Sequence, residues 1–190
     1  VSEPTKKSFS YYPKKKYELI SVINNGIKFT NTIKSVDDYR SFFSFEKNAF
    51  IIGAIGRLEK QKNHIFLINI LPYLAGITLV IVGKGKLKSF LLSRAEELEV
   101  SERLIIIDEV NTENIPEFLK SIDIFIMPSI FEGLSVSLIE ALHARLPIIT
   151  SDIPSQKNVL YNPNDKSISG YLINLNKPKK WISTILFLRD

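Results

Sequence analysis

The sequence contains no cysteine, one methionine and two histidines among its 190 residues. Without cysteine, the chain has no disulfide framework and no thiolate nucleophile, which fits a reducing compartment. No apolar run approaches the roughly 18 residues that a transmembrane helix needs, and no signal-peptide pattern opens the chain. We therefore expect a cytoplasmic protein, either free or peripheral at the inner membrane surface.

The charge balance is basic, with a net charge of +5 and a pI of about 9.3. Such a balance favours anionic partners such as nucleotides, phosphates, nucleic acid or a membrane surface. Lysines and aromatic residues alternate near the N-terminus, at Lys6, Lys7, Phe9, Tyr11, Tyr12 and Lys14–Lys16. No nucleic-acid recognition motif accompanies them, so we interpret them as a solvated basic face that leaves peripheral membrane contact open and predict no nucleic-acid partner.

The ends of the chain suggest a piece of a longer protein. Residue 1 is valine, the single methionine is Met127, and the last residues follow an amphipathic pattern with no helix stop signal. Residues 1–16 are polar, and we expect them to be irregular; residues 1–20 are expected to be a linker or the edge of an absent N-terminal domain. We expect residues 21–190 to form one domain, since their length suffices for a full core.

Short apolar runs alternate with helical stretches along this domain. We predict strands at 50–55, 77–82, 104–107, 122–127, 148–150 and 171–173, with a further strand or linker at 17–23 and a turn at 24–26. We predict helices at 36–43, 63–74, 87–99, 115–120, 155–160 and 178–188. The strands are continuous Ile, Val and Leu runs, which is typical of parallel strands buried on both faces. The expected fold class is α/β, a Rossmann-like doubly wound parallel sheet that binds ligands at the carboxyl ends of its strands.

Two glutamates mark the region after the fourth core strand. Glu132 lies on a loop, and Glu140 lies on the helix that Ser135 is expected to cap. Eight helical residues span roughly 12 Å, so the two carboxylates have different tasks. The helix start offers the free N–H groups of Gly133, Leu134 and Ser135, which form an anion site. We predict an anion at these amides, a hydroxyl-bearing group at Glu140 and chemistry near Glu132, and we expect this apolar helix to be buried.

A second basic motif follows the first core strand. That strand delivers Gly56 and Arg57 to the binding edge, and Lys62 follows near a helix start. Two cations beside a helix N-terminus suit a diphosphate, but on spacing alone the better interpretation is that both are surface cations.

Three further motifs are weaker evidence for a function. Gly83-Lys84-Gly85 after the second strand is better interpreted as a tight turn than as a phosphate loop. Glu140 and His143 have the spacing of a metal-binding pair, but no second pair exists, so we predict no metal site. The histidines also form no serine–histidine–acid set, so nothing supports hydrolase chemistry.

The segment FEGLSVSLIEALHARLPIITSD (131–152) resembles the E-x7-E signature of retaining group 1 (GT4-like) glycosyltransferases of the two-domain GT-B fold. Glu132-Gly133 and Glu140-Ala141 match it, and Gly56-Arg57-Leu58 with Lys62 resembles the family's pyrophosphate-binding segment. Arg145 departs from the pattern, standing where a glycine is usual, and so does Glu109.

The resemblance implies the C-terminal, donor-binding domain of such an enzyme, with a UDP- or GDP-linked sugar as donor substrate and no other cofactor. Arg57 and Lys62 would hold the pyrophosphate, and Glu140 the ribose hydroxyls. The amides of Gly133 and Leu134 would face phosphate, Glu132 would lie by the sugar, and the backbone of Val110 would contact the base. The resemblance further implies sugar transfer with retention of configuration to a glycan or lipid-linked acceptor, as in polysaccharide or capsule synthesis.

Two alternatives stay open at this stage. A nucleotide-sugar epimerase or a phosphorylase can share the GT-B fold, and a product assay would discriminate. A degenerate scaffold module is the other alternative, to which the Arg145 and Glu109 departures lend support.

Overall fold

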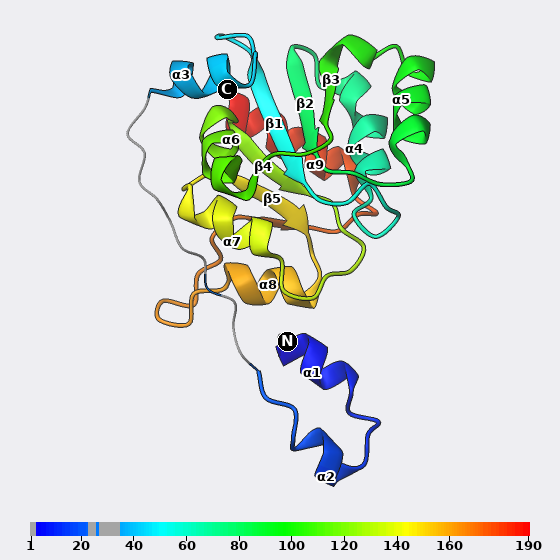
Figure 1. The fold of residues 1–190 in the computed structure, drawn as a ribbon, viewed down its shortest axis with the longest axis vertical. Helices are drawn as coiled ribbons and strands as arrows, with labels where there is room; N and C mark the ends of the chain where they lie inside the picture. Colours follow the sequence, from blue (N-terminus) through cyan, green and yellow to red (C-terminus); the bar gives the residue numbers. More distant parts are fainter. Residues whose placement is uncertain (1–2, 23–25, 27–34) are drawn as a thin grey trace.

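The computed structural model describes residues 3–22, 26 and 35–190. This part of the chain contains a six-stranded sheet flanked by helices (Figure 1). The strands are β1 (Phe50–Ile55), β2 (Ile77–Val82), β3 (Leu104–Ile107), β4 (Ile124–Met127), β5 (Ile148–Ser151) and β6 (Tyr171–Ile173). The α-helices are α1 (Glu3–Ser8), α2 (Lys14–Tyr17), α3 (Val36–Phe42), α4 (His64–Ile70), α5 (Lys88–Glu97), α6 (Ile115–Ser121), α7 (Val136–His143), α8 (Pro154–Leu160) and α9 (Pro178–Arg189). Of these described helices, none has the length and apolarity needed to cross a membrane.

The sheet confirms the predicted doubly wound topology. Its strand order is β3-β2-β1-β4-β5-β6, and every neighbouring pair is parallel. The chain builds outward from β1 to β3, returns to the centre, and builds outward again from β4 to β6. The loops that follow β1 and β4 therefore lie side by side at the switch point, where open α/β sheets bind their ligands.

Alternate residues of the strands pack on opposite faces of the sheet. Ile52 and Ala54 of β1 belong to the core beneath α4, α5 and α9, whereas Ile51 belongs to the core shared with α6, α7 and α8. Trp181 of α9 is completely buried and packs edge-on against Phe66, with 5.1 Å between ring centroids. Burial on both faces is why the strands are continuous apolar runs.

The sequence places β1, β2, β3 and β6 with the bounds that the structure shows. The fourth strand was predicted to begin at residue 122, but β4 begins at Ile124. Asp123 lies outside the strand because its carboxylate accepts the Ile51 amide at 2.7 Å and binds the guanidinium of Arg40.

The helix predicted at 63–74 is shorter in the structure. It ends at Ile70 and tightens into a 3₁₀ turn, η1 (Leu71–Tyr73). Pro72 causes this change, since it has no N–H to donate to the carbonyl four residues earlier.

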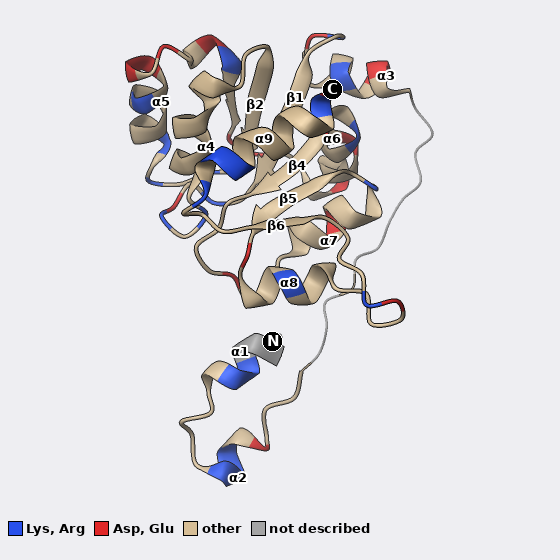
Figure 2. Cartoon of the chain, turned by 180° about the vertical axis from the view of Figure 1, so that it is seen from behind, with Lys and Arg blue, Asp and Glu red and all other residues tan. Residues whose placement is uncertain are grey.

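The prediction that residues 1–16 are irregular was wrong for the described part, which contains α1 and α2. Both are short, with six and four residues, and rich in lysine (Figure 2), and such short elements need no apolar periodicity. Residues 18–22 contain no strand, so the described part of the 17–23 segment gives the strand alternative no support. The turn predicted at Asn24-Asn25-Gly26 falls mainly outside the described residues.

Arg145 has a left-handed backbone with φ of +59°. Its amide donates to the Leu142 carbonyl at 3.0 Å, and the next amide, of Leu146, donates to Ala141 at 3.3 Å. These two bonds form a Schellman motif that ends α7, and its left-handed position favours glycine. The turn therefore keeps the geometry that glycine favours, and Arg145 adopts a strained left-handed backbone to fit it.

Replacing Arg145 with glycine is expected to stabilise the protein by about 0.5–1 kcal/mol, because the relief of left-handed strain exceeds glycine's extra chain entropy. Urea denaturation of R145G would measure the gain. The adjacent Ala144 has a right-handed helical backbone, so A144G should instead destabilise the protein. A loss of stability in R145G would contradict the strain assignment.

Candidate functional site

The loops that follow β1 and β4 are joined by three hydrogen bonds. The Ile130 amide donates to the Gln61 carbonyl at 2.9 Å, and Gln61 Nε2 donates to the Phe131 carbonyl at 3.0 Å. Asn63 Nδ2 donates to the Pro128 carbonyl at 3.2 Å. Two loops almost 70 residues apart in the sequence are thus held together at the carboxyl edge of the sheet.

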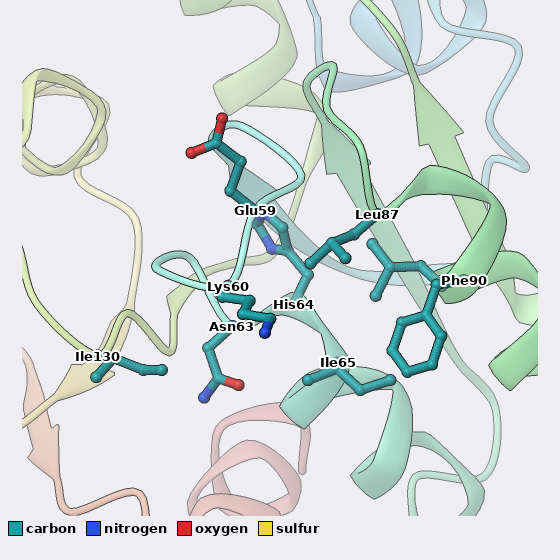
Figure 3. A pocket seen from close by; sticks show the side chains of 9 residues that line it. Glu59, Lys60, Asn63, His64, Ile65, Leu87, Phe90 and Ile130 are labelled. Atoms are coloured by element: carbon teal, nitrogen blue, oxygen red, sulfur yellow. The ribbon is translucent and has the colours of Figure 1, made fainter.

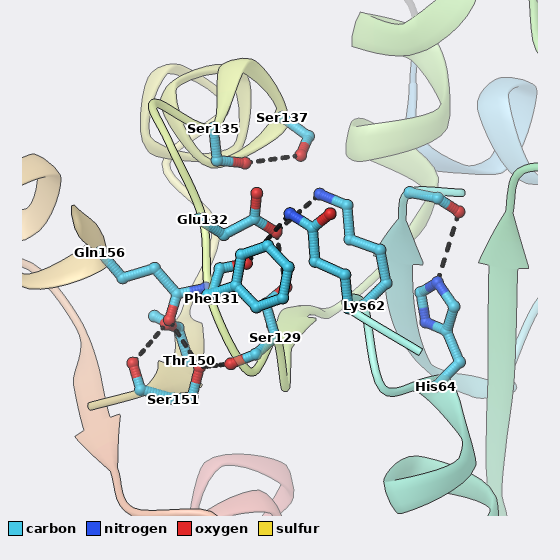
Figure 4. A network of polar contacts seen from close by, with 12 residues as sticks. Lys62, His64, Ser129, Phe131, Glu132, Ser135, Ser137, Thr150, Ser151 and Gln156 are labelled. Atoms are coloured by element: carbon cyan, nitrogen blue, oxygen red, sulfur yellow. Dashed lines mark hydrogen bonds and ion pairs between the residues drawn. The ribbon is translucent and has the colours of Figure 1, made fainter. Parts of the chain in front are cut away.

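An ion pair also joins these two loops (Figure 4). Lys62 Nζ contacts Glu132 Oε1 at 2.7 Å, and the two side chains are only 15% and 7% exposed. Ser129 Oγ donates to the same carboxylate oxygen at 2.6 Å. The structure therefore brings together two residues predicted to act on different parts of a ligand. A charge pair this well buried is strongly coupled, because little water screens it.

Glycines allow the loops to approach closely. A Cβ on Gly56 would lie 2.9 Å from Cδ and Cε of Lys62, so the absent side chain makes room for the lysine stem. A Cβ on Gly83 would lie 2.1 Å from the Gly56 carbonyl oxygen, and one on Gly85 would lie 2.4 Å from that of Leu58. The Gly83-Lys84-Gly85 turn is thus explained by packing against the β1 loop, as the tight-turn interpretation expects.

Arg57 is placed differently from Lys62. Its side chain is 70% exposed, and its guanidinium contacts Glu59 at 3.5 Å. It stands at the same sheet edge as Lys62 but outside the buried ion pair, so its charge is free to turn toward a ligand.

The start of α7 presents backbone donors. No hydrogen bond joins the amides of Gly133, Leu134 or Ser135 to another of the residues that the structure describes. Ser135 occupies the N-cap position, but the predicted cap was wrong in one respect: its hydroxyl contacts Ser137 Oγ at 3.1 Å and makes no cap hydrogen bond. The helix start therefore keeps free backbone donors, an arrangement that favours anions.

The expectation that α7 is buried on nearly all sides was also wrong. Only Leu138 and Ala141 are buried, while Val136 is 42% exposed. The helix lies between α6 and α8 (Figure 1), so its remaining side faces solvent. Glu140 is half-buried on this helix, and burial raises the pKa of its carboxyl. No described residue neutralises it, which suits a group that awaits a hydrogen-bonding ligand.

Val110 is partly buried in the loop after β3. The neighbouring acidic residues of that loop form ion pairs on the surface, Glu109 with Lys84 and Asp108 with Lys88. Glu109 thus has a local electrostatic role.

A cavity of about 310 Å³ lies beside the site, between the start of α4 and α5 (Figure 3). Leu87, Phe90 and Ile130 contribute to its mainly apolar wall, and His64 also lines it. His64 Nε2 is 3.3 Å from the Gly56 carbonyl, which can only accept, so this nitrogen carries the proton. Burial lowers the pKa of His64 to about 4, although that hydrogen bond opposes the shift. His64 is neutral at pH 7.

The stability of the protein is expected to fall as the pH drops from about 6.5 to about 4. Above the ordinary histidine pKa of about 6.5, His64 is neutral in both states; below it, only the unfolded chain binds the proton. The loss from this residue reaches roughly 3 kcal/mol by pH 4. Denaturant titrations at stepped pH, with H64Q as the control that lacks the group, would measure it; identical pH slopes in both proteins would contradict the assignment.

The sequence model for "Glycosyl transferases group 1" matches residues 35–188. The chain belongs to this family.

Two curated relatives of this group 1 glycosyltransferase chain are bacterial proteins that are themselves named as sugar transferases. It is 31% identical over 181 residues to an Escherichia coli UDP-Gal:α-D-GlcNAc-diphosphoundecaprenol α-1,3-galactosyltransferase, covering 90% of this chain and 45% of the relative. It is 33% identical over 186 residues to the Staphylococcus aureus capsular polysaccharide biosynthesis glycosyltransferase CapH, covering 94% and 47%. The chain spans about half the length of these relatives.

Solved structures share the fold. The Anabaena protein HepE in complex with UDP-glucose has a TM-score of 0.83 at 18% identity, covering all of this chain and 52% of HepE. The C-terminal domain of a group 1 protein (LpcC) from Francisella tularensis has a TM-score of 0.68 at 17% identity, covering 83% of each chain. These likenesses confirm the Rossmann-like half of the GT-B fold.

The sequence of this glycosyltransferase chain did not single out Ser129, Gln61 or Asn63, which hold the site together. Ser129 lies two residues before the segment 131–152, and its position three residues before Glu132 was the only available signal. The pairing of Lys62 with Glu132 was equally hidden, because it depends on the contact between two loops.

Proposed function

We propose that this chain is the donor-binding domain, residues 21–190, of a retaining glycosyltransferase that transfers a sugar from a nucleoside diphosphate sugar to a glycan or lipid-linked acceptor. The observation that carries the proposal is the buried Lys62–Glu132 pair at the switch point of the sheet, beside the open start of α7. The relative named for UDP-Gal and the HepE complex with UDP-glucose favour a UDP-linked donor over a GDP-linked one.

Each site residue then has a part in donor binding. The diphosphate lies against the amides of Gly133, Leu134 and Ser135, where the helix dipole favours negative charge. Glu140 accepts hydrogen bonds from the ribose hydroxyls, and the backbone near Val110 contacts the base. Arg57 turns from solvent onto the diphosphate, close to the backbone of Gly56.

Lys62 and Glu132 lie where the reaction occurs. The bond between the anomeric carbon and the phosphate oxygen breaks, and an acceptor oxygen bonds to that carbon on the same face. The acceptor's proton passes to the departing phosphate. Negative charge grows on the leaving diphosphate, so cations at Lys62 and Arg57 stabilise the transition state more than the bound donor. Glu132 binds the sugar and keeps Lys62 oriented.

The acceptor is bound mainly by parts of the protein outside this chain, which spans about half of its relatives' length. The 190-residue chain alone is therefore expected to bind donor weakly and to turn over little, because acceptor positioning and water exclusion are incomplete. The lysines of residues 1–20 add a basic surface that suits an anionic membrane, to which the whole protein would attach peripherally.

Isothermal titration calorimetry with UDP, GDP and their sugars tests the proposal. We expect UDP and at least one UDP-sugar to bind at submillimolar to millimolar ligand concentrations. Failure of every nucleotide to bind at millimolar concentration would refute the proposed function.

Replacing Glu140 with glutamine is expected to have opposite effects on stability and binding. The variant should be slightly more stable, because it removes a half-buried carboxylate that no described residue neutralises. It should bind UDP about tenfold more weakly, since a neutral amide accepts the ribose hydroxyls less strongly. Thermal unfolding and calorimetry measure the two effects; unchanged UDP affinity would remove Glu140 from the ribose site.

A further inference from the structure

Ser129 lies in the loop after β4 and is completely buried. Its hydroxyl donates to Glu132 Oε1 at 2.6 Å, the same oxygen that Lys62 contacts at 2.7 Å. Its backbone carbonyl accepts a hydrogen bond from Ser151 Oγ at the end of β5. One serine thus links the ion pair of the site to the neighbouring strand (Figure 4).

We propose that Ser129 is a positioning residue that fixes the direction of the Glu132 carboxylate, with Ser151 and Gln156 as its support. The inference rests on the proposed function, because it assigns the carboxylate so fixed to the sugar of the donor. It adds residues on β5 and α8 to a site that the sequence motifs confine to the β1 and β4 loops and α7.

The two oxygens of Glu132 are used unequally. Lys62 and Ser129 both bind Oε1, whereas none of the described residues hydrogen-bonds to Oε2. Two donors on one oxygen, from two directions, hold the carboxyl group in one rotamer. Oε2 is therefore the oxygen that Glu132 presents to a ligand.

The support behind Ser129 is a buried polar cluster. Ser151 and Gln156 are each 1% exposed, and Ser151 Oγ lies 2.8 Å from Gln156 Oε1. Thr150 Oγ1 also bonds to Gln156 Oε1. The cluster is only partly satisfied, because Gln156 Nε2 is buried without a hydrogen-bond partner among the described residues. The Ser151 hydroxyl, which bonds to the Ser129 carbonyl, holds the loop against the end of β5.

A serine with a purely structural role would satisfy backbone groups, as Ser121 does. Ser121 is also completely buried, but its hydroxyl donates only to the Phe118 carbonyl at 2.7 Å, at the amino end of β4. The Ser129 hydroxyl instead donates to a charged side chain, that of Glu132. A hydrogen bond to a charged group is stronger than one to a neutral group. Ser121 is accordingly the matched control.

The experiment compares the affinity for UDP with the affinities for UDP-glucose, UDP-galactose and UDP-N-acetylglucosamine, measured by calorimetry. The ratio between UDP and the tightest UDP-sugar reports the contact with the sugar alone. We expect S129A to reduce this ratio about tenfold, or to 1 where the native ratio is smaller, while the affinity for UDP changes less than twofold. S121A should leave both unchanged. In the E132Q background, S129A should have less than a twofold effect, since both changes act through one carboxylate.

The outcomes are distinct. A native ratio kept in S129A overturns the inference and leaves the proposed function intact, whereas a native chain that binds no nucleotide defeats the proposed function. A native chain that binds UDP with no preference for any sugar also overturns the inference, because Glu132 then has no sugar contact to direct. Equal weakening of UDP and UDP-sugar by S129A indicates a merely structural role and overturns it too. Should S129A fail to fold, S151A serves as the second variant. It keeps the Ser129 hydroxyl but removes the hydrogen bond to the Ser129 carbonyl, so it must lower the same ratio. An unchanged ratio in S151A would overturn the inference.

Discussion

Replacing Lys62 with methionine is expected to destabilise the protein by about 3 kcal/mol. The lysine ammonium is 2.7 Å from a carboxylate oxygen of Glu132, whose side chain is only 7% exposed. Without Lys62, that carboxylate stays buried with a hydroxyl as its remaining partner, and an uncompensated buried charge is costly. Urea denaturation at pH 7 measures the loss.

The same substitution should remove donor binding. Lys62 is the cation that the structure places nearest to Glu132, and the proposed diphosphate lies between it and the amides at the start of α7. We expect the affinity for UDP to fall about a hundredfold, the equivalent of losing a strong charge-assisted contact. Calorimetry at a temperature where the variant is folded measures this change.

The double variant K62M/E132Q separates the two effects. It replaces the ion pair with neutral groups of similar shape, so its stability should return to within about 1 kcal/mol of the native protein. Its affinity for UDP should remain low, since no cation is restored. A single K62M variant as stable as the native protein would contradict the buried-pair assignment, and native affinity in the double variant would contradict the role of Lys62.

Replacing Arg40 with methionine is expected to cost about 3–5 kcal/mol of stability and nothing in nucleotide affinity. The Arg40 side chain is 9% exposed, and its guanidinium contacts both carboxylate oxygens of Asp123, at 3.0 and 2.9 Å. Its other nitrogens donate to the carbonyls of Ser121 and Lys47. The substitution removes the donor of two backbone carbonyls and leaves the Asp123 carboxylate with the Ile51 amide but no cation.

This second pair is the structural counterpart of the first. It ties α3 to the amino end of β4, whereas Lys62 and Glu132 lie at the carboxyl ends of β1 and β4. Arg94 offers a matched surface control, because its contact with Glu97 is 36% and 59% exposed, so R94M should change stability by less than about 0.5 kcal/mol. A tenfold loss of UDP affinity in folded R40M would show that the binding edge depends on α3, contrary to the account.

The fold was predictable because its main determinant is local. Continuous apolar runs such as 77–82, alternating with helical segments, leave few arrangements other than a buried parallel sheet. The errors arose where a single residue acts through its backbone or a distant partner. Pro72 shortens a helix, Asp123 delays a strand, and α2 forms with no apolar periodicity at all.

The site was predictable by composition but not by geometry. Glu132, Glu140 and Lys62 stand out because charged residues follow apolar strands. The sequence could not show that Lys62 pairs with Glu132 or that Ser129 shares the same oxygen, because these contacts depend on side-chain rotamers and on two loops meeting. Nor could spacing reveal that Ser135 contacts Ser137 in place of capping its helix.

A crystal structure of the chain with bound UDP would locate the diphosphate. We expect the diphosphate within hydrogen-bonding distance of the Gly133 and Leu134 amides and of Lys62, with the ribose hydroxyls on Glu140. UDP bound in the cavity beside Phe90, or on any surface away from the start of α7, would contradict the proposed donor site.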